Sequence, residues 1–311
     1  MANNGPVNGE KETSPTPETR IAEAAAMPRA NGVPTSRMIG QLILFPLAIV
    51  AVCVAIYLLY GLLTREERTA RDLLNEVRAG GSSRRWQAAY SLAAMLARPN
   101  AKGVDAALVP EILRAFDASK NDDPRVRQYL ALSLGRLGDR RATSTLVGAL
   151  DDAHDETRIS AIWSLGELGD SSSVLPLLRQ AESDDPGIRK IAAHTLGLIQ
   201  DSRALPALRG MLNASDPNVR WNAALALCRF QDRSGAPVIG EMLNRELLGR
   251  IPEMTDEQRE EAMLMAIRGG VLLQDRALIP TLRTIKAGDP SLKVRQAAIE
   301  ALDALGQRAN P

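Results

Sequence analysis

The stretch DPRVRQYLALSLGRLGD, residues 123–139, decides the fold because it recurs three more times along the chain. The further copies are DETRISAIWSLGELGD at 155–170, DPGIRKIAAHTLGLIQD at 185–201 and DPNVRWNAALALCRFQD at 216–232. Their arginines, Arg127, Arg158, Arg189 and Arg220, follow one another at intervals of 31 residues. A fixed period of this length predicts a stack of repeated units rather than one globular core.

Each copy predicts one helix. Its apolar residues fall 3, 4, 7 and 10 positions after the arginine, which places them on a single stripe. Three of the four copies begin with Asp-Pro, in which the aspartate caps a helix and the proline fits its first turn. The segments that follow, such as 201–212 with Leu205, Leu208 and Leu212 on one face, predict a second helix. Each unit is therefore expected to be a helix pair.

Weaker copies extend the array in both directions. One contains Arg85-Trp86-Gln87-Ala88-Ala89, and another contains Val294-Arg295-Gln296-Ala297-Ala298. A degenerate copy lies before the last one, and its apolar spacing places Met263 at the arginine position. The array then has seven units. An insertion at 244–255 interrupts the period, and it either lies across one end of the array's inner groove or is only a tolerated loop.

The repeated phrase resembles the HEAT-like repeats first described in phycobilisome lyases, over roughly residues 65–306. The resemblance implies an all-α fold, a right-handed α-solenoid of about seven HEAT-like helix pairs over residues 64–308. It also implies that the arginine-bearing helices line the concave side. The function stays open, because this repeat serves scaffolds, lyases, hydroxylases and nucleic-acid enzymes alike.

The chain ahead of the repeats has a different composition. Residues 1–38 are rich in Asn, Gly, Pro, Ala, Thr and Glu without apolar periodicity, which predicts a disordered tail. No charged residue occurs between Arg37 and Arg65, and residues 39–63 are predicted to form one uncleaved transmembrane helix. Three arginines before this segment against four after it favour a cytoplasmic repeat domain in a single-pass protein, with the extracytoplasmic side as the alternative.

Composition argues against several classes of function. The 38 basic and 37 acidic residues give no basic surplus, so no nucleic-acid partner is expected. The cysteines Cys53 and Cys228 form neither a disulfide framework nor a thiolate metal site. The histidines His154 and His194 lack the His-Glu pairing of iron-dependent hydroxylases built on this repeat. No catalytic, metal or cofactor site is predicted, and the chain is not expected to be an enzyme.

The repeat arginines are predicted to be structural. They lie in the first turn of each helix at the edge of the buried stripe, where they are expected to hydrogen-bond loop carbonyls and aspartates between neighbouring units. This group is Arg127, Arg158, Arg189, Arg220 and Arg295. The alternative is a ladder of anion-binding sites.

The face opposite the buried stripe carries the aromatic residues. All three tryptophans, and both tyrosines outside the apolar segment, fall on it, interleaved with arginine and lysine. This composition is typical of a protein-binding hot spot, although lateral packing against the next helix would also explain it. The predicted partner-binding residues are Trp86, Tyr90, Tyr129, Arg136, Trp163, Lys190, His194, Trp221 and Arg229.

The sequence therefore predicts a membrane-anchored scaffold. It recruits a protein or peptide of unknown identity through an aromatic-lined concave groove and contacts the lipid bilayer through residues 39–63. The alternative, which comes from the resemblance, is a tetrapyrrole (bilin) lyase or chaperone whose aromatic side chains stack on the ring.

Overall fold

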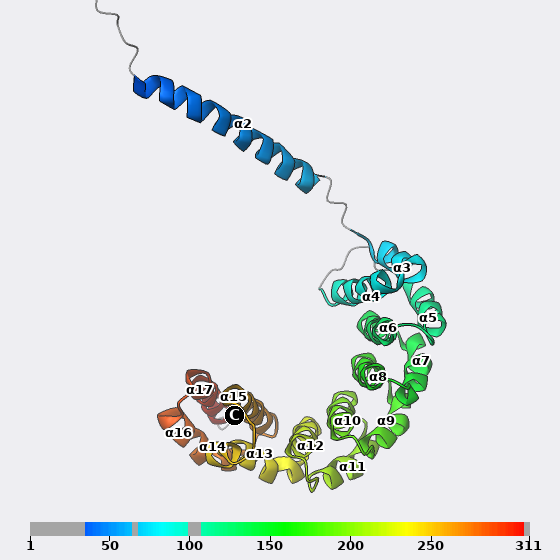
Figure 1. Ribbon diagram of the computed structural model, residues 1–311. Helices are drawn as coiled ribbons and strands as arrows, with labels where there is room; N and C mark the ends of the chain where they lie inside the picture. Colours follow the sequence, from blue (N-terminus) through cyan, green and yellow to red (C-terminus); the bar gives the residue numbers. More distant parts are fainter. Residues whose placement is uncertain (1–34, 64–67, 99–106, 308–311) are drawn as a thin grey trace, which may run out of the picture. The chain divides into compact units, whose positions relative to one another are not determined.

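The computed structural model describes residues 35–63, 68–98 and 107–307, and every regular element in these ranges is a helix (Figure 1). The chain divides into two compact units, Met1–Glu67 and Arg68–Pro311. Most of the predicted tail, residues 1–34, lies outside the described residues. The predicted boundaries of the tail, the apolar segment and the repeat region stay predictions.

The first unit contains helix α2, Thr35–Leu63, which has Pro46 inside it. Its described side chains, residues 45–60, are all exposed. A bilayer span needs about 20 consecutive apolar residues in one helix, and in the described part of the chain no helix is both long enough and apolar enough to cross a membrane. The expected transmembrane helix at 39–63 is therefore not supported, and neither is the membrane localisation that depended on it.

The second unit is an array of seven helix pairs, counted over the described residues from 68 to 307. The first four pairs are α3 (Ala70–Ala79) with α4 (Ser82–Leu96), α5 (Leu108–Ala118) with α6 (Pro124–Leu137), α7 (Thr143–Gly148) with α8 (Asp155–Leu168), and α9 (Val174–Ala181) with α10 (Pro186–Ile199). The remaining pairs are α11 (Leu205–Met211) with α12 (Pro217–Arg229), α13 (Ala236–Met242) with α15 (Asp256–Leu272), and α16 (Ile279–Gly288) with α17 (Leu292–Gln307). Helix α14, Arg245–Gly249, lies within the insertion.

The second helices of successive pairs form an inner row. Figure 1 shows α4, α6, α8, α10 and α12 on the inner side of a curved array, with α5, α7, α9 and α11 on the outer side. Each helix of the inner row packs against the next, from α4 through α6, α8, α10, α12 and α15 to α17. The concave side is thus lined by the helices that carry the repeat arginines.

Local sequence signals set the helix ends. The side chains of Asp185 and Asp216 accept hydrogen bonds from the first-turn N–H groups of α10 and α12, and a proline follows each aspartate. Helices α6 and α8 end at Gly138 and Gly169, whose φ angles of 66° and 60° lie in the left-handed region that glycine adopts without steric cost. The pattern read from the sequence therefore fixes where these helices begin and end.

Small residues allow the inner helices to approach one another closely. A Cβ atom built on Gly197 of α10 would lie 2.5 Å from the Cβ of Ala226 on α12, and one on Gly135 of α6 would lie 2.5 Å from the Cβ of Ser164 on α8. At the second contact the Ser164 hydroxyl donates to the carbonyl of Ala131 at 2.9 Å, so the polar group that enters the interface is paired. The inner row is consequently packed without space for one more methyl group at these positions.

Replacing Gly197 by alanine tests this close approach. We expect Gly197→Ala to lower the free energy of unfolding by about 1–3 kcal/mol, because the added methyl group has to push two helix backbones apart. The matched control is Gly210→Ala in α11, where an added Cβ meets nothing within 4 Å. The control is expected to be neutral or to stabilise by up to about 1 kcal/mol through helix propensity. Urea unfolding measures both, and equal stabilities of the two variants would contradict the packing described above.

Candidate functional site

Every inner helix carries an arginine at its fourth residue. These residues are Arg85, Arg127, Arg158, Arg189, Arg220, Arg259 and Arg295. Each donates a side-chain hydrogen bond of 2.7–3.0 Å to a backbone carbonyl that precedes its helix, and the acceptors are Val77, Phe116, Asp152, Ser183, Ala214, Met254 and Asp289 in the same order. Carbonyls at helix ends and in turns lack helical partners, and the arginines supply a donor to them. The carbonyl of Phe116 also accepts from the N–H and the hydroxyl of Ser119.

Two of these arginines also reach the next pair. Nε of Arg127 lies 2.8 Å from Oδ2 of Asp152, and both side chains are nine-tenths buried or nearly so. Arg85 forms an ion pair with Asp122. The other arginines of the predicted set bind carbonyls of their own pair, which places most of these hydrogen bonds within units rather than between them.

The sixth pair corrects one part of the sequence interpretation. Met263, expected at the arginine position, is a core residue with 1% exposure. Arg259 takes that position, because the capping box between Thr255 and Gln258 starts α15 one turn earlier than the apolar spacing indicates. The insertion had displaced the 31-residue period, and the Thr-x-x-Gln capping signal was the feature that could have located this arginine.

Aromatic rings of adjacent inner helices contact one another. Tyr90 of α4 and Tyr129 of α6 meet edge to face with ring centroids 5.2 Å apart. Trp163 of α8 and His194 of α10 stack with centroids 5.4 Å apart and planes inclined by 3°. Tyr90 is 53% exposed, and the other three are partly buried. The rings therefore form interhelical pairs that keep part of their surface accessible.

Trp86 of α4 also contacts the neighbouring inner helix, through an arginine side chain of α6. The guanidinium carbon of Arg125 on α6 lies 4.3 Å from the ring centroid of Trp86 on α4, which is a cation–π contact. Trp86 also packs against the main hydrophobic core. We define the inner aromatic surface as Trp86, Tyr90, Tyr129, Trp163 and His194.

Trp221 does not belong to this surface, and its assignment to an exposed groove was wrong. It is 7% exposed and belongs to the second hydrophobic core cluster, which extends from the fifth to the seventh pair. Ile251 and Met254, both from the insertion, pack against the same cluster. A large indole gains stability when apolar side chains cover it, and the insertion brings such cover to this point of the array alone.

The predicted basic residues differ in their surroundings. Arg136 is half-buried and donates to the carbonyl of Ala93 at 2.6 Å, which ties α6 to the end of α4. Burial lowers the pKa of the Arg229 guanidinium. The pKa of His194 is also lowered, mainly by burial and to a smaller extent by the positive charge of Arg229. Lys190 is exposed. It lies on α10 one turn before His194, whereas Arg125, which was not among the predicted residues, lies over Trp86 and is paired with Asp123.

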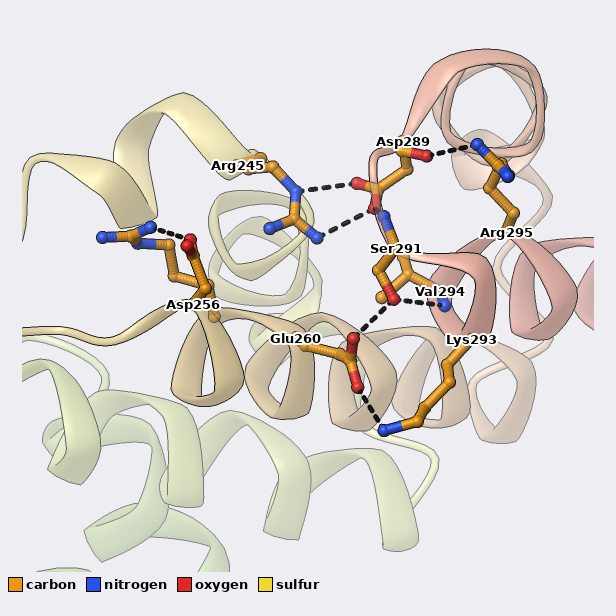
Figure 2. A network of polar contacts seen from close by, with 9 residues as sticks. Arg245, Asp256, Glu260, Asp289, Ser291, Lys293, Val294 and Arg295 are labelled. Atoms are coloured by element: carbon orange, nitrogen blue, oxygen red, sulfur yellow. Dashed lines mark hydrogen bonds and ion pairs between the residues drawn. The ribbon is translucent and has the colours of Figure 1, made fainter.

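The insertion is fixed to the last pair by an ion pair. Figure 2 shows Arg245 of α14 directed at Asp289, with Nε 2.9 Å and one terminal nitrogen 2.8 Å from the two carboxylate oxygens. The side chain of Asp289 is 4% exposed. Bidentate arginine–carboxylate pairs of this kind fix orientation as well as distance. The segment that covers Trp221 is therefore held at both of its ends by folded elements.

Cys228 is a buried free cysteine of the array. Burial raises the pKa of the Cys228 thiol to about 12, which disfavours the thiolate that a nucleophile would need. Within residues 35–63, 68–98 and 107–307 no group of three or more His, Cys, Asp or Glu side chains is placed to hold a metal ion. The expectation that the chain is not an enzyme stays a prediction.

Comparisons with known proteins identify the repeat. The family model described as HEAT repeats matches residues 112–186, 146–214 and 174–250. The complex of CpcE and CpcF of phycocyanin lyase from Nostoc sp. PCC7120 is a similar structure, with a TM-score of 0.52 and 16% identity over 78% of this chain and 96% of that chain. Human deoxyhypusine hydroxylase has a TM-score of 0.33 and 16% identity over 76% of this chain and 84% of that chain. A search of curated proteins gives no match.

These findings confirm the predicted HEAT repeats and the α-solenoid architecture. At 16% identity the likeness to the lyase complex shows the fold alone. It does not extend to what that complex acts on, because one repeat architecture hosts many functions.

Trp221 and Tyr90 are expected to respond differently to truncation. Trp221→Ala should lower the free energy of unfolding by about 3–5 kcal/mol, because it leaves a large cavity in the second core cluster. Tyr90→Ala should cost only about 0.5–1.5 kcal/mol, the range of one aromatic pair at a half-exposed position. Chemical denaturation monitored by circular dichroism provides the comparison. If Trp221→Ala were as stable as Tyr90→Ala, the assignment of Trp221 to the hydrophobic core would be wrong.

His194 makes stability depend on pH. Its folded-state pKa is lowered from 6.5, so the unfolded chain takes up the proton first and stability falls as the pH drops below about 6.5. We expect the thermal midpoint to fall less between pH 8 and pH 5.5 in His194→Gln than in the native chain. The matched control, His154→Gln at an exposed position, should retain the native pH dependence. Identical pH profiles for His194→Gln and the native chain would refute this assignment.

Proposed function

We infer that this HEAT-repeat chain is a scaffold that binds another protein or peptide through the inner aromatic surface of α4, α6, α8 and α10. The observation that carries the proposal is the pairing of rings across helix boundaries, Tyr90 with Tyr129 and Trp163 with His194, with part of each pair still accessible. Rings already fixed by their neighbours lose little conformational entropy when a partner covers them, and this favours binding.

Charge beside the rings supports the same function. Arg125, which also pairs with Asp123, lies over Trp86, and the exposed Lys190 lies one helical turn before His194. Aromatic residues combined with arginine are the composition of binding hot spots. Trp221, Arg136 and Arg229 have structural surroundings, so the proposed contact set is smaller than the one the sequence predicted. A partner segment that lies along the inner row would place apolar side chains against the two ring pairs.

The alternative is a lyase or chaperone for a tetrapyrrole, by analogy with the phycocyanin lyase complex. That activity belongs to the similar structure, and the shared fold does not carry it to this chain. A visible absorption band that forms when bilin or heme is added to the purified chain would favour this alternative over the scaffold.

Photocrosslinking tests the scaffold directly. A photoreactive phenylalanine derivative at position 90 should capture one predominant protein in cells, whereas the same group at position 175 should not. Leu175 is the control because it is 57% exposed and lies on α9 in the outer row.

Substitution gives the quantitative measurement. Tyr90→Ala combined with Trp163→Ala should reduce recovery of the captured protein at least about tenfold, as expected for loss of two hot-spot residues. Leu175→Ala should leave the recovery unchanged, and thermal unfolding should show that all of the variants are folded. Undiminished recovery with the folded double variant would rule out the inner aromatic surface as the binding site.

A further inference from the structure

A cavity lies beyond the inner aromatic surface, between α12 and α15 of the inner row. It has a volume of about 430 Å³ and is bounded by α12, α15 and the turn formed by residues 251–254 of the insertion. Its apolar lining comes from Trp221, Leu225, Met254 and Met265. This is where the insertion meets the face that partners of the inner row would approach.

Two carboxylates line the same cavity without a cation. Glu253 and Glu261 are exposed, and neither forms an ion pair with any described residue. No arginine, lysine or histidine is among the residues that line it. Nearby acidic residues are paired: Figure 2 shows Glu260 with Lys293 at 2.9 Å and Asp289 with Arg245 at 2.8 Å. The cavity therefore carries uncompensated negative charge beside an indole.

The backbone at Glu253 is unfavourable for that residue. Its φ angle is 59°, and the N–H of Met254 donates to the carbonyl of Ile251 at 3.4 Å, closing a turn with Pro252 at its second position. This arrangement is typical of a type II turn, in which glycine is favoured at the third position. The other non-glycine residues with positive φ, Gln200, Gln231 and Gln274, lie at the ends of inner helices, where a left-handed residue is common. A glutamate at this turn therefore has a local cost to stability.

The turn is nevertheless held in place. Arg259 donates to the carbonyl of Met254 at 2.7 Å, and the pair of Arg245 with Asp289 fixes the start of the insertion. Because this wall of the cavity is already fixed, less conformational entropy is lost when a ligand binds. The cavity is consequently a preformed site rather than a gap under a loose loop.

We propose that this cavity binds the side chain of an arginine from a partner protein. The carboxylates of Glu253 and Glu261 neutralise the guanidinium, and the small exposed part of the Trp221 indole lines the cavity beside it. The methylene groups pack against Met254, Met265 and Leu225. The inference rests on the proposed function, because it assigns the chemistry of a partner residue that enters at the end of the inner row.

A titration with single amino-acid derivatives tests the cavity without the partner. N-acetyl-arginine amide is added to the full-length chain labelled at the tryptophan indole nitrogens, and the signal of Trp221 is identified with Trp221→Phe. We expect that signal to move with added arginine derivative. The neutral isostere N-acetyl-citrulline amide should leave it in place, because citrulline has the same shape without the charge.

Substitutions separate binding from folding. Glu253→Gly removes one carboxylate and relieves the positive φ, so it should keep or raise the thermal midpoint while weakening the arginine response about three- to tenfold. Glu261→Gln should weaken it to a similar extent. Glu241→Gln is the matched control, since Glu241 is exposed on α13 and does not line the cavity; it should bind as the native chain does.

Equal responses to arginine and citrulline, no movement of the Trp221 signal, or undiminished binding by Glu253→Gly would each overturn the proposal. These outcomes are independent of the crosslinking experiment at position 90 and of the double variant at Tyr90 and Trp163. Capture of a partner at the inner aromatic surface together with no arginine response would reject the cavity and leave the scaffold intact. An arginine response with no captured partner would support the cavity and reject the inner aromatic surface.

Discussion

The hydrogen bond from the fourth residue of each inner helix to the turn before it is the interaction on which the array depends. An arginine makes this bond in all seven pairs, from Arg85 to Arg295, at 2.7–3.0 Å. The guanidinium has several donors on a long side chain, so it reaches the carbonyl while its methylene groups cover the edge of the core. The angle between the two helices of each pair is thereby constrained, and a regular stack of pairs requires that constraint.

Regular stacking then determines which side chains stay accessible. Each inner helix uses one side for its outer partner and two edges for its inner neighbours, with glycine or alanine where backbones approach most closely, as at Gly197 and Ala226. Only the concave side is left for residues that serve no packing purpose. Rings on that side meet the rings of the next helix, as Trp163 meets His194. From the sequence, lateral packing of these rings and their accessibility are alternatives. In the structure, each ring packs against its neighbour and keeps part of its surface accessible.

The insertion breaks this regularity at one place. It moves the start of α15, brings Ile251 and Met254 onto the core cluster that contains Trp221, and places Glu253 at the edge of a cavity. The twelve-residue insertion therefore buries one aromatic residue, Trp221, and adds a negatively charged cavity beside it. The insertion therefore makes the sixth pair different from the other pairs of the array.

The sequence by itself determined the parts of this protein that depend on neighbours within one helix or one turn. The 31-residue period, the Asp-Pro starts, the glycine ends at Gly138 and Gly169 and the buried positions after each arginine are local, and the helix pairs follow them. It also placed Tyr90, Tyr129, Trp163 and His194 on one face. The Thr255–Gln258 capping box, also local, carried the information that Arg259 and not Met263 takes the arginine position. The tertiary structure alone decided that Trp221 is buried and that Glu253 and Glu261 line one cavity with α12. Those outcomes depend on contacts between segments that are distant along the chain, and helical periodicity carries no information about which distant segment will cover a given face.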